Sequence, residues 1–496
     1  MAQTSEEMIG EKKPFMLKIL INGEWKDSKS GESHPSYNPS TGEVIAHVPY
    51  VSKEEVHEAL TAAQQAFPKW SNLPITERVK YLFRLKDAFD HHHEDLAKVN
   101  SINHGKTIVE SRGDVRRAID NIESAIAVAH TLSKGETQDQ IATDVDESVV
   151  KEPLGPFGII CPFNFPLMIP FWFIPYALVL GDTLVMKPSE ITPVPMDVAT
   201  DFIQKEVKFP PGVLNVIHGG RETSEALISH EATQGIAFVG STPVAKQVYK
   251  LAGEHGKRAL VNGGAKNPIV VMPDADLGST IPAVVSSFFG NAGQRCLAGA
   301  NLVTVGDIHD KVLSKFKTAS TELKIGAAMD EKTDMGPVVS RSAKERISSN
   351  IVQGIEDGAK PVIDGRSVKL TEFPDGFYLG PTIFDDVTED MRLSRNEIFG
   401  PVASTISEGN LDDAIEFINS STKFGNMASI FTTSGRSARE FRRRVNAGNI
   451  GINIGVAAPA GNFPFGGRRE SFYGILHAQI DTVEFFTDKK ITISRW

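Results

Sequence analysis

The sequence predicts an α/β protein with two successive domains, each built on a largely parallel sheet. Between Phe157 and Val271, short β-rich runs (FGIIC, TLVMK, VLNVI, GIAFV and NPIVV) alternate with helical stretches, which is typical of βα units. A second series begins beyond Asp276, where NLVTV, ASTIS and MASIF are separated by further helical stretches. The sequence shows no repeat of about 20 to 50 residues, which excludes a solenoid.

Composition and charge limit the classes of partner. The 496 residues carry 52 Lys+Arg against 62 Asp+Glu, a net charge of −10 that argues against nucleic acid or an anionic membrane surface. The uncharged stretch from Phe157 to Leu180 is long enough to cross a bilayer. We nevertheless expect no membrane span, because its prolines would break a lone helix repeatedly.

The cysteines and the N-terminus bear on location. Cys161 and Cys296 are too few for a disulfide framework, which favours a reducing compartment. The N-terminal stretch MAQTSEEMIGEKKPF has neither an apolar core nor an Arg-rich amphipathic pattern, so it predicts no targeting signal. We therefore expect a cytoplasmic protein.

The first part of the chain predicts strands followed by helices. LKILING and EVIAHVP alternate like strands, and NPSTGE (38–43) between them supplies turn residues, which predicts an edge hairpin. From Lys53 to about Val128 the apolar periodicity is helical and predicts two or three helices. Ser52 is the expected N-cap of the first of them.

Two polar motifs in this helical region predict no site. The run HHH (91–93) occupies consecutive helical positions, which point in different directions and cannot converge on one metal ion. HGKT (104–107) resembles the end of a phosphate-binding loop, but Asn100 stands where the first glycine is required and no strand precedes it. We therefore expect no metal site and no P-loop.

The turn FVGSTPVAKQV (238–248) is a candidate for phosphate binding. It follows a predicted strand, and Gly240 and Ser241 would open a helix. The free N–H groups and positive dipole end of such a helix suit a pyrophosphate. No GxGxxG motif accompanies the turn, and any βα turn looks similar, so this signal is weak by itself.

FGNAGQRCLA places Cys296 among small residues after a helical stretch. Its thiol is either an exposed nucleophile or, as the alternative, a small buried hydrophobe. The charge of the adjacent Arg295 is expected to lower the thiol pKa and so to favour the nucleophilic thiolate. Cys161, inside the apolar stretch FGIICPF, is expected to be a packing residue.

Four segments resemble motifs of the aldehyde dehydrogenase superfamily in order and spacing: CPFNFP (161–166), KPSE (187–190), GQRC (293–296) and EIFGP (397–401). With NPSTGE and the FVGST turn, the resemblance covers nearly the whole chain. It implies an aldehyde dehydrogenase-like fold with a Rossmann-type NAD-binding domain, an α/β catalytic domain and a β oligomerisation element. The implied ranges are 1–134 and 154–263, 264–470, and 135–153 with 471–496, respectively.

Both parts of the oligomerisation element look like edge strands. Exposed edge strands are usually covered, so we expect them to pair across a subunit boundary in a homodimer or homotetramer.

The resemblance also implies roles for single residues. Cys296 would attack the aldehyde carbon, and the Asn164 amide with the Cys296 backbone N–H would bind the resulting oxyanion; a plain turn residue is the alternative for Asn164. Lys187 and Glu190 would hold the adenosine ribose, or else form only a surface ion pair. The Glu190 carboxylate would repel a 2′-phosphate, which favours NAD over NADP. The other implied cofactor-binding residues are Phe163, Gly240, Ser241, Gly263, Glu397 and Phe399.

One position departs from most of the superfamily. Where other members carry a glutamate that activates water, 34 positions before the nucleophile, this chain has Asn262 in NGGAKNP (262–268). An amide cannot take a proton from water at neutral pH, so hydrolysis of a thioacyl enzyme is expected to be slow. A thiol supplies some thiolate without a strong base, which makes coenzyme A a reasonable acyl acceptor.

This pattern resembles the CoA-acylating methylmalonate-semialdehyde dehydrogenases, which share FFGNAGQRC, the asparagine before GAKN and a C-terminal SFYG. Arg295, and Arg117 in GDVRRA, match carboxylate-binding positions of that branch. They would clamp the distal carboxylate of malonate or methylmalonate semialdehyde, although Arg117 could also be an ordinary exposed helix charge. The implied products are acetyl-CoA or propionyl-CoA, CO₂ or bicarbonate, and NADH.

Two other functions stay open at this point. Gly263 and Pro268 differ from the branch, and PFGGRRES (464–471) is closer to hydrolytic members. An NAD-dependent hydrolytic aldehyde dehydrogenase could use Glu470 or a relayed water in place of the missing base. A non-catalytic NAD-binding scaffold is the other alternative, and the presence of Cys296 together with Asn164 argues against it.

Overall fold

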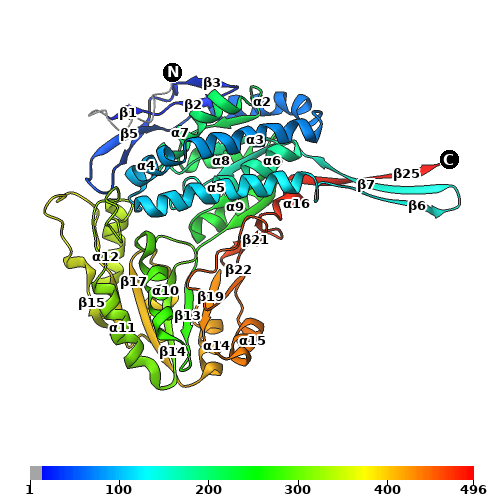
Figure 1. Cartoon of the computed structure of the whole chain (residues 1–496). Helices are drawn as coiled ribbons and strands as arrows, with labels where there is room; N and C mark the ends of the chain where they lie inside the picture. The colour runs from blue at the N-terminus through cyan, green and yellow to red at the C-terminus, as the bar shows by residue number, and fades with distance from the viewer. Residues whose placement is uncertain (1–13) are drawn as a thin grey trace.

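The computed structural model describes residues 14–496, so the N-terminal stretch on which the targeting expectation rests lies almost wholly outside it. Figure 1 shows two layered α/β bodies, one above the other, and a long ribbon of strands that projects from the upper body. Within the described residues, no helix is both long enough and apolar enough to cross a membrane.

The upper body is built on an eight-stranded sheet in the order β23-β12-β11-β8-β9-β10-β2-β3. The strands β8 to β12 run parallel, and every residue of β8, β9, β10 and β11 is buried, because helices cover both faces of the sheet (Figure 1). The strands are β2 (Ile19–Ile21), β3 (Glu24–Lys26), β8 (Pro156–Ile160), β9 (Thr183–Lys187), β10 (Leu214–Val216), β11 (Gly235–Val239), β12 (Arg258–Asn262) and β23 (Phe472–Tyr473).

The helices of this body are α2 (Lys53–Ser71), α3 (Ile75–His91), α4 (His93–His104), α5 (Ile108–Ala129), α6 (Ile174–Leu180), α7 (Val194–Phe202), α8 (Arg221–Ser229) and α9 (Thr242–Glu254). Ser52 caps α2 in a capping box with Glu55, as predicted. The prediction of two or three helices before residue 128 is wrong in number. Four form, because the chain breaks at His92 and again at Gly105, whose φ of +88° ends α4.

The order of the parallel strands fixes where a ligand can bind. The chain order reverses between β8 and β11, which lie side by side although β9 and β10 come between them in sequence. Ligands of such sheets bind beyond the carboxyl ends of the strands at this switch point. CPFNFP follows β8, KPSE starts at the end of β9 and Gly240 follows β11, so three of the predicted motifs meet at one edge.

The lower body has a seven-stranded sheet in the order β15-β16-β17-β14-β13-β19-β20, parallel except for β15. The prediction that NPIVV belongs to the first sheet is wrong, because this run pairs with strands on both sides in the second sheet. The strands are β13 (Asn267–Val271), β14 (Gly299–Val305), β15 (Lys360–Ile363), β16 (Thr382–Asp385), β17 (Val402–Glu408), β19 (Met427–Phe431) and β20 (Asn449–Ile452). The main helices are α10 (Leu277–Phe289), α11 (His309–Thr321), α12 (Arg341–Glu356), α14 (Leu411–Ser420) and α15 (Gly435–Arg444).

The predicted N-terminal hairpin is also wrong. The strand β2 pairs with β3 and β10, whereas β5 (Val44–Pro49) pairs with β4 (Ser33–Tyr37) and β1 (Phe15–Met16) in a separate sheet. NPSTGE therefore joins β4 to β5. The reason is a nearer turn at Asn22 and Gly23, both with positive φ, which is the residue pair that two-residue hairpins prefer.

The projecting ribbon contains β6 (Glu136–Ala142), β7 (Val145–Pro153) and β25 (Thr487–Arg495), with β7 in the middle (Figure 1). The strand β25 pairs with β7 along its full length. Ile491 and Ile493 on β25 are 68% and 67% exposed, which is unusual for isoleucine. Pairing of this ribbon with another subunit stays a prediction.

Candidate active site

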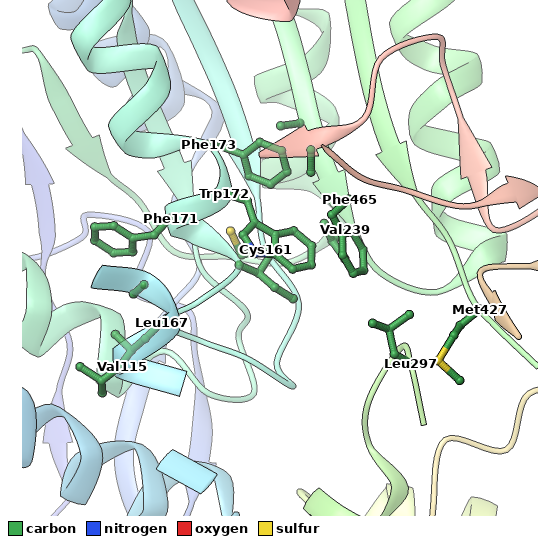
Figure 2. Close-up of a cluster of buried hydrophobic side chains, with 14 of the residues drawn as sticks. Val115, Cys161, Leu167, Phe171, Trp172, Phe173, Val239, Leu297, Met427 and Phe465 are labelled. Carbon is green, nitrogen blue, oxygen red and sulfur yellow. The ribbon is translucent and has the colours of Figure 1, made fainter. Parts of the chain in front are cut away.

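A cavity next to Cys296 is enclosed by α5, the nucleophile loop and the C-terminal part of the chain. It brings three sequence-predicted residues together, namely Cys296, Arg117 and Arg295. Figure 2 shows part of its apolar surroundings, where the rings of Trp172 and Phe465 lie 4.3 Å apart. The lining residues are Lys106, Glu110, Gly113, Asp114, Arg117, Asn121, Phe165, Met168, Trp172, Asn291, Arg295, Cys296, Leu297, Val456, Ala458, Pro459, Phe465 and Gln479.

The loop that carries Cys296 is held rigidly. Asn291 and Ala292 have φ of +53° and +49°, a left-handed turn that these residues adopt only when surrounding contacts impose it. The side-chain amides of Asn267 and Asn426 donate to the Cys296 carbonyl oxygen at 2.9 and 2.8 Å. The backbone of the partly exposed cysteine is therefore fixed by one residue of β13 and by the residue just before β19. Neither amide was predicted from the sequence.

Burial raises the pKa of the Cys296 thiol to about 12, and the charge of Glu397 acts in the same direction. The backbone N–H groups of Cys296 and Leu297 act in the opposite direction but do not outweigh burial. The charge of Arg295 lowers this pKa, as expected from the sequence, but burial outweighs it, so the thiol pKa lies above its ordinary value. Arg295 Nη2 lies 2.7 Å from Glu110 Oε1, so its charge is already paired.

We expect the rate of Cys296 alkylation by iodoacetamide in the free enzyme to rise about tenfold per pH unit between roughly pH 6 and pH 9. The reason is that the thiolate fraction does not saturate in this range when the thiol pKa is about 12. Mass spectrometry of the adduct measures the rate, and Cys296→Ala shows the contribution of buried Cys161. A plateau between pH 7 and pH 8 would contradict the expectation.

Asn164, in the loop after β8, lies against the nucleophile loop. It is 3% exposed, and its Nδ2 donates to the Gln294 carbonyl oxygen at 3.2 Å. An amide group has two N–H donors, so the second one is available to an oxygen atom bound at Cys296. The arrangement suits an oxyanion site, and that role stays a prediction.

A buried ion pair that the sequence did not predict supports Asn164. Lys106 Nζ lies 2.9 Å from Asp114 Oδ2 and donates to the Asn164 carbonyl oxygen at 2.8 Å, and both charged side chains are wholly buried. Asp114 also accepts from the Met168 backbone N–H at 2.7 Å and from Asn100 Nδ2 at 2.9 Å. HGKT therefore contributes a lysine to the cavity, where it is paired with Asp114. Its place next to a capped helix was the only signal available in the sequence.

Replacing Lys106 with methionine is expected to lower the free energy of unfolding by about 3 to 5 kcal/mol, because Asp114 would remain as an unpaired buried charge. Urea unfolding measures the change. The double variant Lys106→Met/Asp114→Leu should recover much of the loss. Lys80→Met, which removes an exposed pair with Glu77, is the matched control and should change stability by less than about 1 kcal/mol. Equal effects of the two single variants would contradict this account.

The charges of the cavity do not balance. Lys106 pairs with Asp114, and Arg295 pairs with Glu110. The side chain of Arg117 forms neither an ion pair nor a hydrogen bond with any residue of 14–496, although it lines the cavity. One positive charge is thus left to meet an anionic group of a ligand.

On the cofactor side, Lys187 and Glu190 lie at the end of β9. Lys187 is 3% exposed, and its Nζ donates to the carbonyl oxygens of Pro188 and Gly219 at 3.0 and 2.9 Å and to Glu190 Oε2 at 3.2 Å. The Glu190 side chain is 40% exposed, so its carboxylate remains open to a ligand. The pair is therefore not an ordinary surface ion pair, because one partner is buried.

Gly240 and Ser241 lie at the N-terminus of α9. Ser241 is the N-cap residue, with extended backbone, and its side chain makes no capping hydrogen bond. Its hydroxyl and the first N–H groups of this 13-residue helix are thus available to a phosphate. The Gly240 N–H donates to the Asn262 carbonyl oxygen at 3.1 Å, which links this turn to the end of β12.

Asn262 ends β12 and is 4% exposed. Neither polar atom of its side-chain amide has a hydrogen-bond partner among the described residues, which is unusual for a buried amide and leaves it free for a ligand. Gly263 follows, and its N–H donates to the Ser471 carbonyl oxygen at 2.9 Å. A Cβ at Gly263 would lie 2.8 Å from the Glu470 carbonyl oxygen, so the close approach requires glycine.

Glu397 and Phe399 face this region from the second body. Glu397 Oε1 accepts from the Ala265 N–H at 2.8 Å, and burial raises the pKa of Glu397 to about 7. The ring of Phe399 meets the ring of Phe163 edge-on, with centroids 5.7 Å apart. Phe163 of the first body and Phe399 of the second, both predicted cofactor residues, are therefore neighbours.

Glu470 is poorly suited to replace the missing base. Its carboxylate lies 2.7 Å from Lys246 Nζ and 3.1 Å from Lys423 Nζ. Hydrogen bonds from these two lysines hold the pKa of Glu470 below its ordinary value, so it binds a proton weakly. It also lies outside the lining of the Cys296 cavity.

The first sheet has the switch point at which such sheets bind dinucleotides, and a rigidly held cysteine lies in a cavity of the same protein. These two features define an oxidoreductase that uses a thiol and a bound dinucleotide on one substrate. The chain belongs to the aldehyde dehydrogenase family, whose model matches residues 25–492, and it is an NAD-dependent aldehyde oxidoreductase. It is 43% identical to malonate-semialdehyde dehydrogenase 2 of Geobacillus kaustophilus, over 97% of this chain and 99% of that protein. It is 41% identical to the malonate-semialdehyde dehydrogenase of Halalkalibacterium halodurans, over 97% and 98% of the two chains.

Solved structures agree with this assignment. The methylmalonate-semialdehyde dehydrogenase of Oceanimonas doudoroffii has a TM-score of 0.95 and 36% identity to this chain, with 97% of this chain and 98% of that one covered. The NAD⁺ complex of an aldehyde dehydrogenase from Bacillus cereus has a TM-score of 0.91 and 29% identity, with 97% and 96% covered.

The residues of this chain fit NAD. The open Glu190 carboxylate suits ribose hydroxyls and would repel a 2′-phosphate, and the uncapped N-terminus of α9 suits a pyrophosphate. Phe163, Phe399 and Glu397, which the resemblance assigns to the cofactor, would border its nicotinamide end.

Proposed function

We propose that this protein oxidises malonate or methylmalonate semialdehyde to acetyl-CoA or propionyl-CoA, with loss of CO₂ and reduction of NAD. The observation that carries the proposal is the unpaired Arg117 in the cavity that holds Cys296. An aldehyde with a second, anionic end matches one free guanidinium near a thiol. The names of the malonate-semialdehyde dehydrogenases that resemble this chain support the same substrate class.

In the proposed reaction, the Cys296 thiolate adds to the aldehyde carbon, and the Asn164 amide donates to the oxygen that becomes negative. Arg117 holds the distal carboxylate and thereby fixes the aldehyde end toward the sulfur. When bound, NAD supplies the hydride acceptor that allows the adduct on Cys296 to become a thioester. The thioester carries a β-carboxylate, which can leave as CO₂ while the Asn164 site stabilises the enolate oxygen. A proton from water then adds to the enolate carbon and gives the acetyl or propionyl thioester.

Asn262 supports transfer of the acyl group to CoA. No carboxylate stands at this position to take a proton from water, whereas the thiol of CoA reacts as a thiolate that forms without a strong base. Glu470, paired with two lysines, is no substitute. CoA is therefore the proposed second substrate.

The test is NADH formation from malonate semialdehyde with and without CoA, followed through the first turnover and the steady state. We expect a burst of about one NADH per active site without CoA and sustained turnover only with it. Equal steady rates without CoA would show that the protein is hydrolytic. NAD binding without any burst would favour the non-catalytic alternative.

Arg117→Met is expected to lower kcat/KM for malonate semialdehyde by about 10- to 100-fold, because charge-assisted hydrogen bonds to the carboxylate are lost. Propanal, which has no carboxylate, should be oxidised by the variant and the parent at similar rates. Arg116→Met is the matched control, since the neighbouring Arg116 pairs with Asp120 and Glu123 on the outer face of α5. Equal losses for the two aldehydes would contradict a carboxylate-binding role.

We also infer that the protein forms homo-oligomers through the ribbon of β6, β7 and β25. The two-thirds exposed Ile491 and Ile493 support this, because a partner would remove their side chains from water. Sedimentation of the parent and of Ile491→Lys/Ile493→Lys distinguishes an assembly from a monomer.

A further inference from the structure

The start of α12 carries a group of positive charges that nothing in the described chain neutralises. Arg341 and Lys344 lie one helical turn apart on α12, and Lys369 lies close enough for its charge to act on Lys344. None of the three side chains forms an ion pair or a hydrogen bond with any residue of 14–496. Arg341 places its guanidinium 5.5 Å from the centre of the Phe377 ring.

This cluster stands out in a protein of net charge −10. Burial lowers the pKa of Lys344, the charges of Arg341 and Lys369 act in the same direction, and no acidic side chain of the described residues opposes them. Cations that repel one another without a partner cost free energy, which an anionic ligand would recover. The cluster therefore points to a ligand with several negative charges.

The cluster lies next to the nucleophile loop. Gln294, two residues before Cys296, accepts the Val339 backbone N–H on its Oε1 at 3.0 Å, and α12 begins two residues after Val339. From the same helix, the guanidinium of Arg346 donates to the Ile398 carbonyl oxygen, next to Phe399. The helix is thus tied both to the segment with the thiol and to the segment that faces the cofactor cleft.

The cluster is also connected through a series of contacts to the segment that follows KPSE. The ring of Phe377, beneath Arg341, packs edge-on against Tyr37 at 6.1 Å. Ser36, the neighbour of Tyr37, donates to the carbonyl oxygen of Ile191, which directly follows Glu190. The cationic cluster and the expected ribose site therefore lie on either side of Ser36 and Tyr37.

We propose that Arg341, Lys344 and Lys369 bind the phosphate groups of coenzyme A while its thiol reaches Cys296. This inference rests on the proposed CoA-acylating function and assigns the nucleotide end of that substrate to a surface of the catalytic body. CoA carries its phosphates at one end and its thiol at the far end of a long arm, which matches a cationic cluster linked through Val339 and Gln294 to the loop that carries the nucleophile.

The experiment compares CoA with pantetheine, which has the same thiol arm but lacks the phosphates and the nucleotide. The readout is the ratio of kcat/KM for CoA to kcat/KM for pantetheine, in which effects on folding and on the acylation steps cancel. We expect this ratio to fall about tenfold in Lys344→Gln and roughly 100-fold in Arg341→Gln/Lys344→Gln. Lys317→Gln, on the exposed face of α11, is the matched control and should leave the ratio at the parent value.

Three results would overturn the proposal. A ratio that is the same in the parent and in both variants would show that the cluster does not contact the phosphates. A loss that appears in kcat/KM for NAD or NADP, with the CoA to pantetheine ratio intact, would assign the cluster to the dinucleotide. A ratio that falls equally in Lys317→Gln would show a general charge effect.

The failure of the proposed function looks different. If neither CoA nor pantetheine sustains turnover of the parent protein, the acyl acceptor is not a thiol. If both thiols sustain it and the variants leave the ratio unchanged, the acyl transfer stands and only the phosphate site is wrong. If the ratio does fall in the variants, dephospho-CoA shows which phosphate is bound. When the 3′-phosphate contacts the cluster, its loss should lower kcat/KM of the parent protein by part of the amount that the variants lose with CoA.

Discussion

Cys296→Ala is expected to abolish NADH formation, with a loss of at least about 10⁴-fold in kcat, because no other thiol reaches the cavity. Replacing a catalytic nucleophile costs on the order of 10⁶-fold in well-characterised enzymes. Cys161, the other cysteine, is 5% exposed in the core, and burial raises its pKa to about 12. Steady-state NADH absorbance with malonate semialdehyde and CoA measures the effect.

The control has two parts. Cys161→Ala should form NADH at a rate near that of the parent, because Cys161 only packs. The Cys296→Ala protein should still fold and bind NAD, measured by calorimetry, because the loop backbone is held by Asn267 and Asn426 and not by the thiol. Undiminished NADH formation in Cys296→Ala would overturn the nucleophile assignment and, with it, the thioester mechanism.

The parts of the fold that the sequence predicted are those with a strong local pattern. Buried parallel strands read as short apolar runs, and every such run became a strand at the expected place. The pairing of those strands was less predictable, because it depends on contacts far apart in sequence. NPIVV reads like the runs before it, yet it lies between β14 and β19 of the other sheet. The prediction of the N-terminal hairpin was wrong for the same reason, because β2 pairs with the nearer strand β3 through the Asn22–Gly23 turn.

In the candidate site too, some residues could be predicted from the sequence and others could not. Motif residues such as Asn164, Lys187 and Cys296 were identified by resemblance. Cys296 lines the cavity, Asn164 donates to the loop that carries it, and Lys187 donates to the Gly219 carbonyl oxygen. The groups that support them have no such signal. Lys106 is an ordinary residue of a polar tetrapeptide until the fold brings it against the Asn164 carbonyl oxygen.

The effect of a neighbouring charge on the thiol pKa is equally hard to predict from the sequence. Arg295 adjoins Cys296 in the chain, which suggested a lowered thiol pKa. In the structure Arg295 does act in that direction, but it also pairs with Glu110, 185 positions away, and burial of the thiol outweighs its charge. A sequence shows which charges exist, whereas the fold decides which of them are still unpaired at the site. Arg117 is the cation that the fold leaves free.

Asn262→Glu is expected to raise the CoA-independent steady rate by about 100-fold or more, because it supplies the base that water lacks. Asn262 is 4% exposed and its amide has no partner in the described chain, so a carboxylate on a side chain one methylene longer would break no existing hydrogen bond. Burial would raise the pKa of that carboxylate toward neutrality, which suits a general base. NADH formation without CoA measures the gain, and the free carboxylic acid is the expected product.

Asn262→Gln is the matched control, since it lengthens the side chain by one methylene and keeps the amide. It should show no gain in CoA-independent turnover, whatever it does to the CoA-dependent rate. If Asn262→Glu also shows no gain while its NADH burst persists, the thioester is shielded from water by the pocket itself, and the choice of CoA does not depend on residue 262. A gain confined to the glutamate variant would instead place the choice between water and a thiol at this one side chain, because the two variants differ only in their ability to accept a proton.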